Sequence, residues 1–456
     1  MSCRVRFAPS PTGHMHIGNA RVALVNYLFA RQQGGEFIFR IDDTDRERSR
    51  REYEKSIIDD IAWLKITYDE TFRQSERTSR YDEVRDDLIA RGVLYECYES
   101  QEELEYKRKA AIATGKPPVY DRASLQLPAR QIEELRATGM EPYLRFKLPN
   151  KVVTWSDIVL GNISYDLTSV SDPVIRKADG TYLYSFSSVV DDIDSGITHI
   201  IRGQDHVTNT AVQIAMFDEI SAGRYKVNFA HLSLMVNKDG SQFSKRIGGL
   251  NLGDFRMAGI DQMAISSLLA TLGTSLDTKP FQAMEDLIKC FDITKFGTNS
   301  PKFDSNDVLK LNRKIMRLKE YNDVKEYISS SKAFEVVREN IDTYNDLRLW
   351  NEIFATGYTP VYTPLSPFEV AILEAARNVL HDGGDNLVWT GFVDTVGRKA
   401  GIAGRNLYMP LRMATTGLEH GPNIANLFEA LGINEVKHRV ESALMRASQV
   451  PSPTSQ

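Results

Sequence analysis

The chain has 456 residues, 42% hydrophobic and 26% charged, an ordinary globular composition with room for about three domains. Its formal net charge of −5 excludes a global positive field, so a nucleic-acid partner would have to be met by local basic patches. The sequence has no apolar run long enough to span a membrane and no apolar core of a secretory signal, and its three cysteines lie far apart. We therefore expect a cytoplasmic protein without membrane contact.

The first 65 residues predict a βαβ unit of a parallel sheet. Residues 4–7 alternate between polar and apolar side chains, as in a short strand, and the segment after Asn19 has the composition of a helix. Residues 36–41 form a dense apolar run of strand length, and apolar side chains recur with helical spacing over residues 53–64. Alternating strands and helices favour an α/β fold.

The remainder of the chain changes character twice. Residues 100–150 are rich in charge and proline, which predicts an insertion that folds on its own. Strand-like apolar segments return in residues 152–201, and they include YLYSF (182–186) and ITHIIRG (197–203). From about residue 300 onward the pattern is mostly helical, and no heptad repeat predicts association, so we expect a monomer.

A stiff polar loop, RFAPSPTGHMHIGNAR, stands between the first strand and the first helix. Helix N-termini attract anions, and imidazole and backbone donors can stabilise negative charge on a phosphate during displacement at phosphorus. A second segment, SQFSKR at residues 241–246, could fold over a polyphosphate through Lys245. Taken singly, the first motif is more often an exposed, proline-stiffened loop and the second a basic surface turn.

Five blocks in order give the chain its resemblance to a known family: RFAPSPTGHMHIGNAR, FRIDDTDRERS, residues 172–210, SQFSKR and GRNLYMPLRMATTGLEHGP. They resemble the class I aminoacyl-tRNA synthetases and, within them, the bacterial-type glutamyl-tRNA synthetases. The resemblance implies that glutamate and ATP form glutamyl-adenylate and pyrophosphate, after which the acyl group passes to the terminal ribose of tRNA(Glu). Charging of tRNA(Gln) as well stays open.

The resemblance also implies an architecture. We expect a Rossmann-type catalytic core with an α+β insertion, followed by an all-α anticodon-binding cage. The core would comprise residues 1–86 and 194–236, with a connective insertion at 87–193 that contacts the tRNA acceptor end. A stem-contact region at 237–318 and the helical anticodon-binding domain at 319–456 would follow.

Residues from three blocks are assigned to the amino acid by the resemblance: Arg6, Ala8, Ser10, Asp42, Tyr184, Ser188 and Arg202. Two arginines suit a substrate with two carboxylates, which favours glutamate over glutamine. An ion pair between Arg202 and Asp205 is the structural alternative. Asp42 stands where relatives usually have a glutamate that binds the substrate's amino group, so its carboxylate is shorter by one methylene.

For ATP, bound with Mg²⁺ that the phosphates and water mainly hold, the resemblance implies His14, His16, Gly18, Asn19, Asp205, Ser244, Lys245 and Arg246. We expect His16 and Lys245 to be the catalytic residues. Gln242 replaces the first lysine of the family's second motif and Gln204 replaces an acid, so each removes a charge near the nucleotide.

Metal and RNA sites follow from the same comparison of residues. Many relatives bind zinc in the insertion through paired cysteines and a histidine, but Cys97 has no second cysteine nearby, so we expect no structural zinc. Two stretches without acids, residues 310–319 and 398–412, could contact tRNA phosphates. Their predicted tRNA-binding residues are Arg313, Arg405 and Arg412.

Three alternatives to this function remain. A glutaminyl-tRNA synthetase would carry a β-barrel anticodon domain, and a shortened paralogue that modifies a tRNA base would lack the cage. A catalytically silent tRNA-binding protein would retain the fold, and Asp42 and Gln242 are the hints for it. Pyrophosphate exchange in the presence of glutamate and tRNA distinguishes the enzyme from the silent protein.

Overall fold

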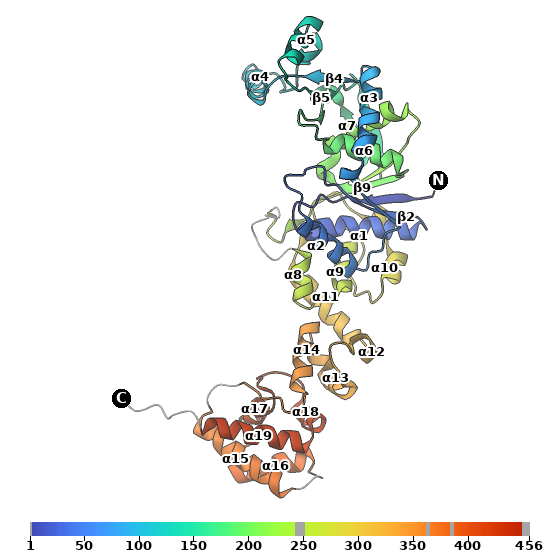
Figure 1. Cartoon of the computed structure of the whole chain (residues 1–456). Helices are drawn as coiled ribbons and strands as arrows, with labels where there is room; N and C mark the ends of the chain where they lie inside the picture. The colour runs from blue at the N-terminus through green and yellow to red at the C-terminus, as the bar shows by residue number, and fades with distance from the viewer. Residues whose placement is uncertain (1, 242–250, 362–364, 384–386, 449–456) are drawn as a thin grey trace. The chain divides into compact units, whose positions relative to one another are not determined.

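The computed structural model describes residues 2–241, 251–361, 365–383 and 387–448. These residues form two compact units (Figure 1): one comprises residues 1–257 and 262–308, and the other comprises residues 258–261 and 309–456. The first unit is mixed α/β and the second is helical, which agrees with the expected architecture. Among the described residues, no helix has both the length and the apolarity needed to cross a bilayer.

The N-terminal βαβ unit is confirmed. Strands β1 (Arg4–Phe7), β2 (Glu36–Ile41) and β3 (Glu70–Arg73) form a parallel sheet in the order β1-β2-β3. Helix α1 (Ile17–Gln32) connects the first two strands and α2 (Arg51–Trp63) the next two. The apolar side chains of α1 are almost all buried because this helix packs against its own sheet on one side and against α9 (Gln262–Thr271) and α10 (Met284–Cys290) elsewhere.

A second sheet continues the first, because the backbone N–H of Thr198 donates to the carbonyl of Arg4 (2.8 Å) at the edge of β1. Its strand order is β7-β6-β10-β9, with β6 (Val152–Asp157), β7 (Gly161–Asp166), β9 (His199–Gly203) and β10 (Asn228–Leu232). Strands β9 and β10 are parallel, whereas β6 and β7 form an antiparallel hairpin. Helices α6 (Tyr184–Asp194) and α7 (Val207–Ser221) belong to this half of the unit.

Segment 182–186, expected to be strand-like because of its apolar residues, is not a strand. Leu183 is the N-cap residue of α6, and the helix runs through Asp194. Phe186, Val189 and Val190 are buried, at the 3–4-residue spacing of one helix face. A short apolar run of five residues therefore does not distinguish a strand from a buried helix, whereas the pattern over the whole segment is helical.

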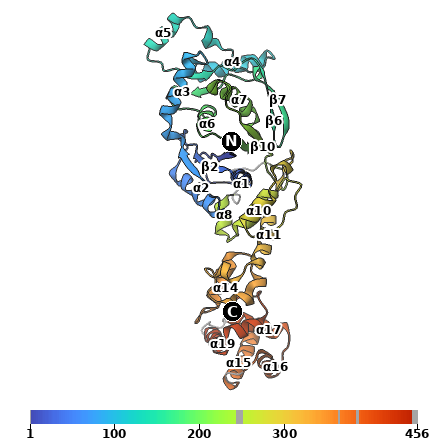
Figure 2. The same cartoon turned by 90° about the vertical axis from the view of Figure 1, so that its right-hand side faces the viewer.

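The insertion is built around an antiparallel sheet of β4 (Leu94–Cys97), β5 (Tyr143–Phe146) and β8 (Val174–Arg176). Helix α3 (Thr78–Ala90) leads into it, and α4 (Gln101–Ala113) and α5 (Ala129–Ala137) extend from it, as Figure 2 shows. Near the end of the first unit lie the short strands β11 (Val236–Asn237) and β12 (Lys302–Phe303) and helix α8 (Leu252–Met257). Helix α11 (Ser305–Leu318) leads into the second unit.

The second unit is all-helical in its described residues. Its helices are α12 (Tyr321–Val324), α13 (Ser331–Val337), α14 (Tyr344–Ile353), α15 (Pro367–Asp382), α16 (Trp389–Ala400), α17 (Arg405–Thr416), α18 (Ile424–Leu431) and α19 (Ile433–Ala447). Helix α15 begins with a capping box of Ser366 and Glu369, and its apolar stripe packs against α16 and α19. The sequence predicted mostly helical structure for this part of the chain, and that prediction is confirmed.

Candidate active site

A pocket of about 530 Å³ opens at the carboxyl ends of β1 and β9, where ligands of open α/β sheets bind. Most predicted ligand residues line it: Arg6, Ala8, Ser10, His16, Gly18, Asn19, Tyr184, Arg202 and Asp205. They come from the first loop, α6, β9 and the segment after it, so positions nearly two hundred residues apart share one cavity. The pocket therefore joins the predicted amino-acid and nucleotide residues.

His16 is the N-cap residue of α1, and its ring lies over the start of the helix. Its Nδ1 accepts hydrogen bonds from the backbone N–H groups of Gly18 (3.1 Å) and Asn19 (3.3 Å). Because Nδ1 is the acceptor, the neutral ring carries its proton on Nε2, which can donate to a phosphate oxygen. The His16 imidazole therefore covers the backbone N–H groups of Gly18 and Asn19 at the N-terminus of α1.

Arg202 is a buried cation at the end of β9. Its Nη1 donates to the hydroxyl of Tyr184 (3.0 Å) and its Nη2 to the hydroxyl of Thr210 (2.5 Å). Burial, together with the nearby charge of Arg6, lowers the pKa of Arg202 below its ordinary value. In the described part of the chain no carboxylate lies within ion-pairing distance of it, so the predicted alternative, a pair with Asp205, is not formed.

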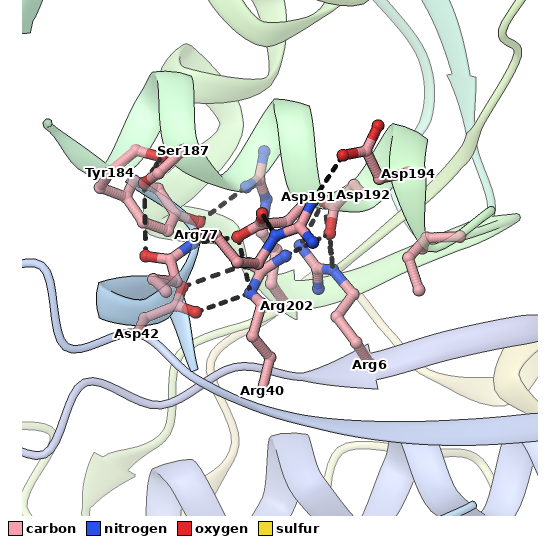
Figure 3. A network of polar contacts seen from close by, with 12 residues as sticks. Arg6, Arg40, Asp42, Arg77, Tyr184, Ser187, Asp191, Asp192, Asp194 and Arg202 are labelled. Carbon is pink, nitrogen blue, oxygen red and sulfur yellow. Dashed lines mark hydrogen bonds and ion pairs between the residues drawn. The ribbon is translucent and has the colours of Figure 1, made fainter. Parts of the chain in front are cut away.

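Arg6 is held by an acidic partner beside the same pocket (Figure 3). Its Nε lies 3.1 Å from Oδ1 of Asp192, which also accepts from Nη1 of Arg40 at 2.7 Å. Burial alone would raise the pKa of Asp192, but the two guanidinium groups outweigh it and the pKa is lowered. A carboxylate ligand reaching Arg6 and Arg202 would therefore meet more positive than negative charge.

Asp42 is buried in the same network and does not line the pocket. Arg40 donates to its two carboxylate oxygens, from Nε at 2.6 Å and from Nη2 at 3.2 Å. Burial raises the pKa of Asp42 to about 6, although Arg40 opposes the change. The backbone N–H of Asp42 donates to the carbonyl of Pro9 (3.0 Å), which ties the end of β2 to the first loop.

The network extends toward the insertion through Asp191. This carboxylate, with no exposed surface, accepts hydrogen bonds from Gln74, Arg77 and the hydroxyl of Tyr81. Burial raises the pKa of Asp191 in spite of these donors. Asp191 pairs with Arg77 and Asp192 with Arg6, and Arg40 lies within ion-pairing distance of both acids.

Two further predicted residues point elsewhere. The Nδ1 atom of His14 lies 3.0 Å from the hydroxyl of Ser56, and its ring packs edge-on against Tyr53, so His14 faces α2. Ser188 is fully buried on α6, and its hydroxyl has no hydrogen-bond partner in the described structure. Neither residue lines the pocket. Gln242, Ser244, Lys245 and Arg246 lie outside the described residues.

Sequence reasoning missed Arg21, which also lines the pocket. Its side chain donates to the carbonyls of Ser233 (2.7 Å) and Leu272 (2.9 Å), and burial lowers its pKa to about 10. Arg21 therefore remains charged at neutral pH and braces the end of β10 against the loop after α9. The position of Arg21 in the helix after the first loop was the signal that could have identified it.

Cys97, the cysteine considered for zinc in the sequence, lies beside a hydrogen-bonded cluster around Glu99. The hydroxyls of Tyr120 and Ser124 both donate to this carboxylate at 2.7 Å, and Sγ of Cys97 lies 3.8 Å from the Tyr120 hydroxyl. Among the described residues, no three His, Cys, Asp or Glu side chains are grouped as metal ligands. The cluster offers one thiol and one carboxylate, which do not fit a tetrahedral zinc site.

Of the predicted tRNA-binding residues, Arg313 donates to Asp342 (2.8 Å). Arg405 is exposed at the start of α17, and Arg412 donates to the carbonyl of Pro422 (2.6 Å) with its side chain half-buried. Burial lowers the pKa of Arg412. The side chain of Arg405 is therefore accessible from solvent, whereas that of Arg412 is tied to the backbone of the second unit.

Comparison with known families gives two matches that divide the chain as its two units do. Residues 2–310 match the catalytic domain of class I tRNA synthetases (E and Q), and residues 310–444 match an anticodon-binding domain. Glutamate–tRNA ligase 2 of Acidiphilium cryptum is 44% identical over 444 residues, which covers 96% of this chain and 99% of that protein. Glutamate–tRNA ligase 1 of Paracoccus denitrificans is 42% identical, with 94% and 98% covered.

Solved structures show the same likeness. A glutamate tRNA ligase from Elizabethkingia meningosepticum, solved in complex with its amino acid, superposes with a TM-score of 0.81 at 26% identity and covers 98% of this chain. A glutamate-tRNA synthetase from Elizabethkingia anophelis gives a TM-score of 0.77, also at 26% identity, over 98% of this chain. These likenesses extend over both units.

Proposed function

Because the chain belongs to the class I tRNA synthetases for glutamate and glutamine, and within them to the glutamate–tRNA ligases, we propose that it activates L-glutamate with ATP and transfers it to tRNA(Glu). The α-carboxylate attacks the α-phosphorus, pyrophosphate leaves, and a hydroxyl of the terminal ribose then displaces AMP from the acyl group. The catalytic roles go to His16, as a donor to phosphate oxygens, and to Lys245, as the charge that follows the leaving pyrophosphate.

The observation that carries the choice of substrate is the pair of guanidinium groups in the pocket. Arg6 shares one carboxylate with Arg40, and Arg202 is buried against two neutral hydroxyls. A buried cation without a counter-ion is costly, and an anionic ligand supplies the missing charge. The second carboxylate of glutamate meets this requirement, whereas the neutral amide of glutamine does not.

The other roles follow the family. Residues 87–193 would contact the acceptor end, 237–318 the stem and 319–456 the anticodon, with Arg313, Arg405 and Arg412 near the RNA. Asp42 acts on the amino group of the substrate only if glutamate binding alters its pairing with Arg40. Mg²⁺ would arrive with ATP and be held by phosphate oxygens. We further propose that the protein acts in the cytoplasm as a monomer.

Charging of purified tRNA(Glu) and tRNA(Gln) in parallel, with labelled glutamate or glutamine, tests the proposal. We expect glutamate attached to tRNA(Glu), and attachment to tRNA(Gln) would show the broader specificity. The absence of glutamate-dependent pyrophosphate exchange at saturating ATP and tRNA, together with tight tRNA binding, would instead identify a silent tRNA-binding protein. Attachment of glutamine would contradict the role given to Arg202.

A further inference from the structure

Behind Arg202, three buried polar side chains continue away from the pocket. The strand register sets them in place: His231 on β10 is the pairing partner of Arg202 on β9, and Phe229 on β10 is the partner of Asp157 on β6. Thr210 comes from α7. Each of Asp157, His231 and Thr210 is at most 3% exposed. None of them lines the pocket, so none is suited to bind substrate directly.

The far end of this series is fixed by Asp157. Its Oδ1 accepts the backbone N–H groups of Val159 (3.0 Å), Leu160 (2.9 Å) and His231 (3.1 Å). Its Oδ2 lies 2.5 Å from Nδ1 of His231. Burial pushes the pKa of Asp157 upward, but these donors outweigh burial and leave the pKa below its ordinary value. Asp157 is therefore ionised at neutral pH.

An ionised carboxylate can only accept, so it selects the form of His231 that carries a proton on Nδ1. In the neutral ring, Nε2 is then an acceptor, and it lies 2.8 Å from the hydroxyl of Thr210. The Thr210 hydroxyl has two acceptors within reach, this nitrogen and, at the longer distance of 3.1 Å, the backbone carbonyl of His206. Donation over the shorter contact, to the ring nitrogen, leaves the oxygen lone pairs of Thr210 directed at other donors. Nη2 of Arg202 is the donor it meets, at 2.5 Å.

We propose that Asp157, His231 and Thr210 are positioning residues for Arg202, and that together they set the affinity of the pocket for the amino-acid substrate. Asp157 fixes the ring, the ring fixes the direction of the hydroxyl, and the hydroxyl holds the guanidinium without neutralising its charge. A carboxylate in place of Thr210 would hold the guanidinium equally well but would compete with the substrate. The proposal rests on the proposed function, because it takes Arg202 to bind glutamate.

The test compares Thr210→Val, which keeps the shape and removes the hydroxyl, with Thr210→Ser, which keeps the hydroxyl. Steady-state charging of tRNA(Glu) gives KM for glutamate and for ATP separately. Hydrogen bonds to charged groups contribute enough that we expect Thr210→Val to raise KM for glutamate about tenfold or more. We expect KM for ATP to change less than about twofold, and Thr210→Ser to behave like the wild type. His231→Gln, as a second route to the same loss, should raise KM for glutamate in the same selective manner.

Thr271→Val is the matched control, because Thr271 is also buried and its hydroxyl bonds to the carbonyl of Ser267 (2.8 Å) on α9. It should leave both KM values unchanged. Folded Thr210→Val and His231→Gln proteins with wild-type KM for glutamate would overturn the proposal, as would equal increases in KM for glutamate and for ATP. Wild-type protein that fails to charge tRNA with glutamate would instead contradict the proposed function, so the two failures are distinct.

Discussion

His16 and Asn251 lie opposite each other in an antiparallel bridge, and next to it the backbone N–H of Leu252 donates to the carbonyl of Met15 at 2.9 Å. The chain that follows residues 242–250 is therefore fastened to the loop that begins α1. Helix α8, which starts at Leu252, also packs against α2. This attachment places Asn251 and Leu252 beside the first motif, whereas Lys245 lies outside the described residues.

Lys245→Ala is expected to reduce pyrophosphate exchange by about a hundredfold or more, because a positioned donor to developing phosphate charge has effects of that order. Lys238→Ala is the control: Lys238 pairs with Asp304 on the surface, and its side chain is 77% exposed. We expect that variant to retain wild-type exchange. Undiminished exchange by Lys245→Ala would refute the catalytic role of this lysine.

Gly18→Ala tests whether the imidazole must lie on the helix start. A Cβ at position 18 would meet Cε1 and Nδ1 of His16 at 2.8 and 2.9 Å, so the ring must move. Alanine favours the helix, so we expect the free energy of unfolding to change by under about 1 kcal/mol while KM for ATP rises about tenfold. In Gly391→Ala, on α16, the added methyl meets only ordinary contact distances, and KM for ATP should stay constant.

Asp60→Asn should stabilise the protein more at neutral than at acidic pH. Burial raises the pKa of Asp60 from 3.8 to about 6, and Arg256 lies 3.6 Å away. Within the described residues, no hydrogen bond reaches the Asp60 carboxylate. Because the folded-state pKa exceeds the unfolded value, the ionised group destabilises the fold; this cost is absent below about pH 4 and complete above about pH 6.

A shift of this size corresponds to at most about 3 kcal/mol, and loss of the attraction to Arg256 reduces the expected gain to about 1–2 kcal/mol at pH 7.5. Denaturant unfolding of both proteins at pH 4.5 and 7.5 measures the difference. Asp59→Asn changes an exposed neighbour and should have little effect at either pH. A gain for Asp60→Asn that is equal at the two pH values would show that ionisation of Asp60 is not the cause.

The hydrogen-bonded cluster in the insertion should make metal unnecessary. Treatment with a zinc chelator is expected to leave Tm unchanged, and elemental analysis of purified protein should find no stoichiometric zinc. Glu99→Ala, in contrast, removes the acceptor shared by Tyr120 and Ser124 and should cost about 1–3 kcal/mol of stability. Loss of structure on chelation would show that zinc is present after all.

Arg405→Ala should affect tRNA binding alone, whereas Arg412→Ala should also affect stability. Arg405 is exposed, so its loss should raise KM for tRNA several-fold, reduce the salt dependence of binding and leave Tm unchanged. Arg412 bonds to the carbonyl of Pro422, so its loss should lower Tm as well. Filter binding at several salt concentrations and thermal unfolding of both variants separate the effects. Equal effects on Tm would show that burial does not distinguish them.

Local patterns predicted those parts of the fold that short-range physics determines. Strands 4–7 and 36–41 and the helix of residues 367–382 were readable because their apolar residues repeat within one element. The strand expected at residues 182–186 was wrong because a short apolar run cannot distinguish a strand from the start of a buried helix. The longer run through Asp194 carried the helical period.

For the candidate site, too, some features could be predicted from the sequence and others could not. Motif order predicted which segments meet, and Arg6, His16 and Arg202 do line one pocket. The partners of these residues were not predictable from local patterns. Asp192 reaches Arg6 through the packing of α6, and Asp157 reaches His231 through strand order and register. Arg40 and Asp42 are the exception. Arg40 lies on β2 and Asp42 directly follows its last residue, and side chains two apart in extended chain point to the same face, so the sequence could have predicted their pairing.

The cap that His16 forms on α1 has an electronic consequence. Two peptide N–H groups at the positive end of the helix draw electron density from Nδ1, and polarisation through the ring makes the opposite N–H a stronger donor. The imidazole of His16 therefore carries the positive electrostatic potential at the N-terminus of α1, a helix of 16 residues, outward by the length of one ring. A nucleotide phosphate that binds here would accept a hydrogen bond from the proton on Nε2 of His16, whose direction the cap already sets.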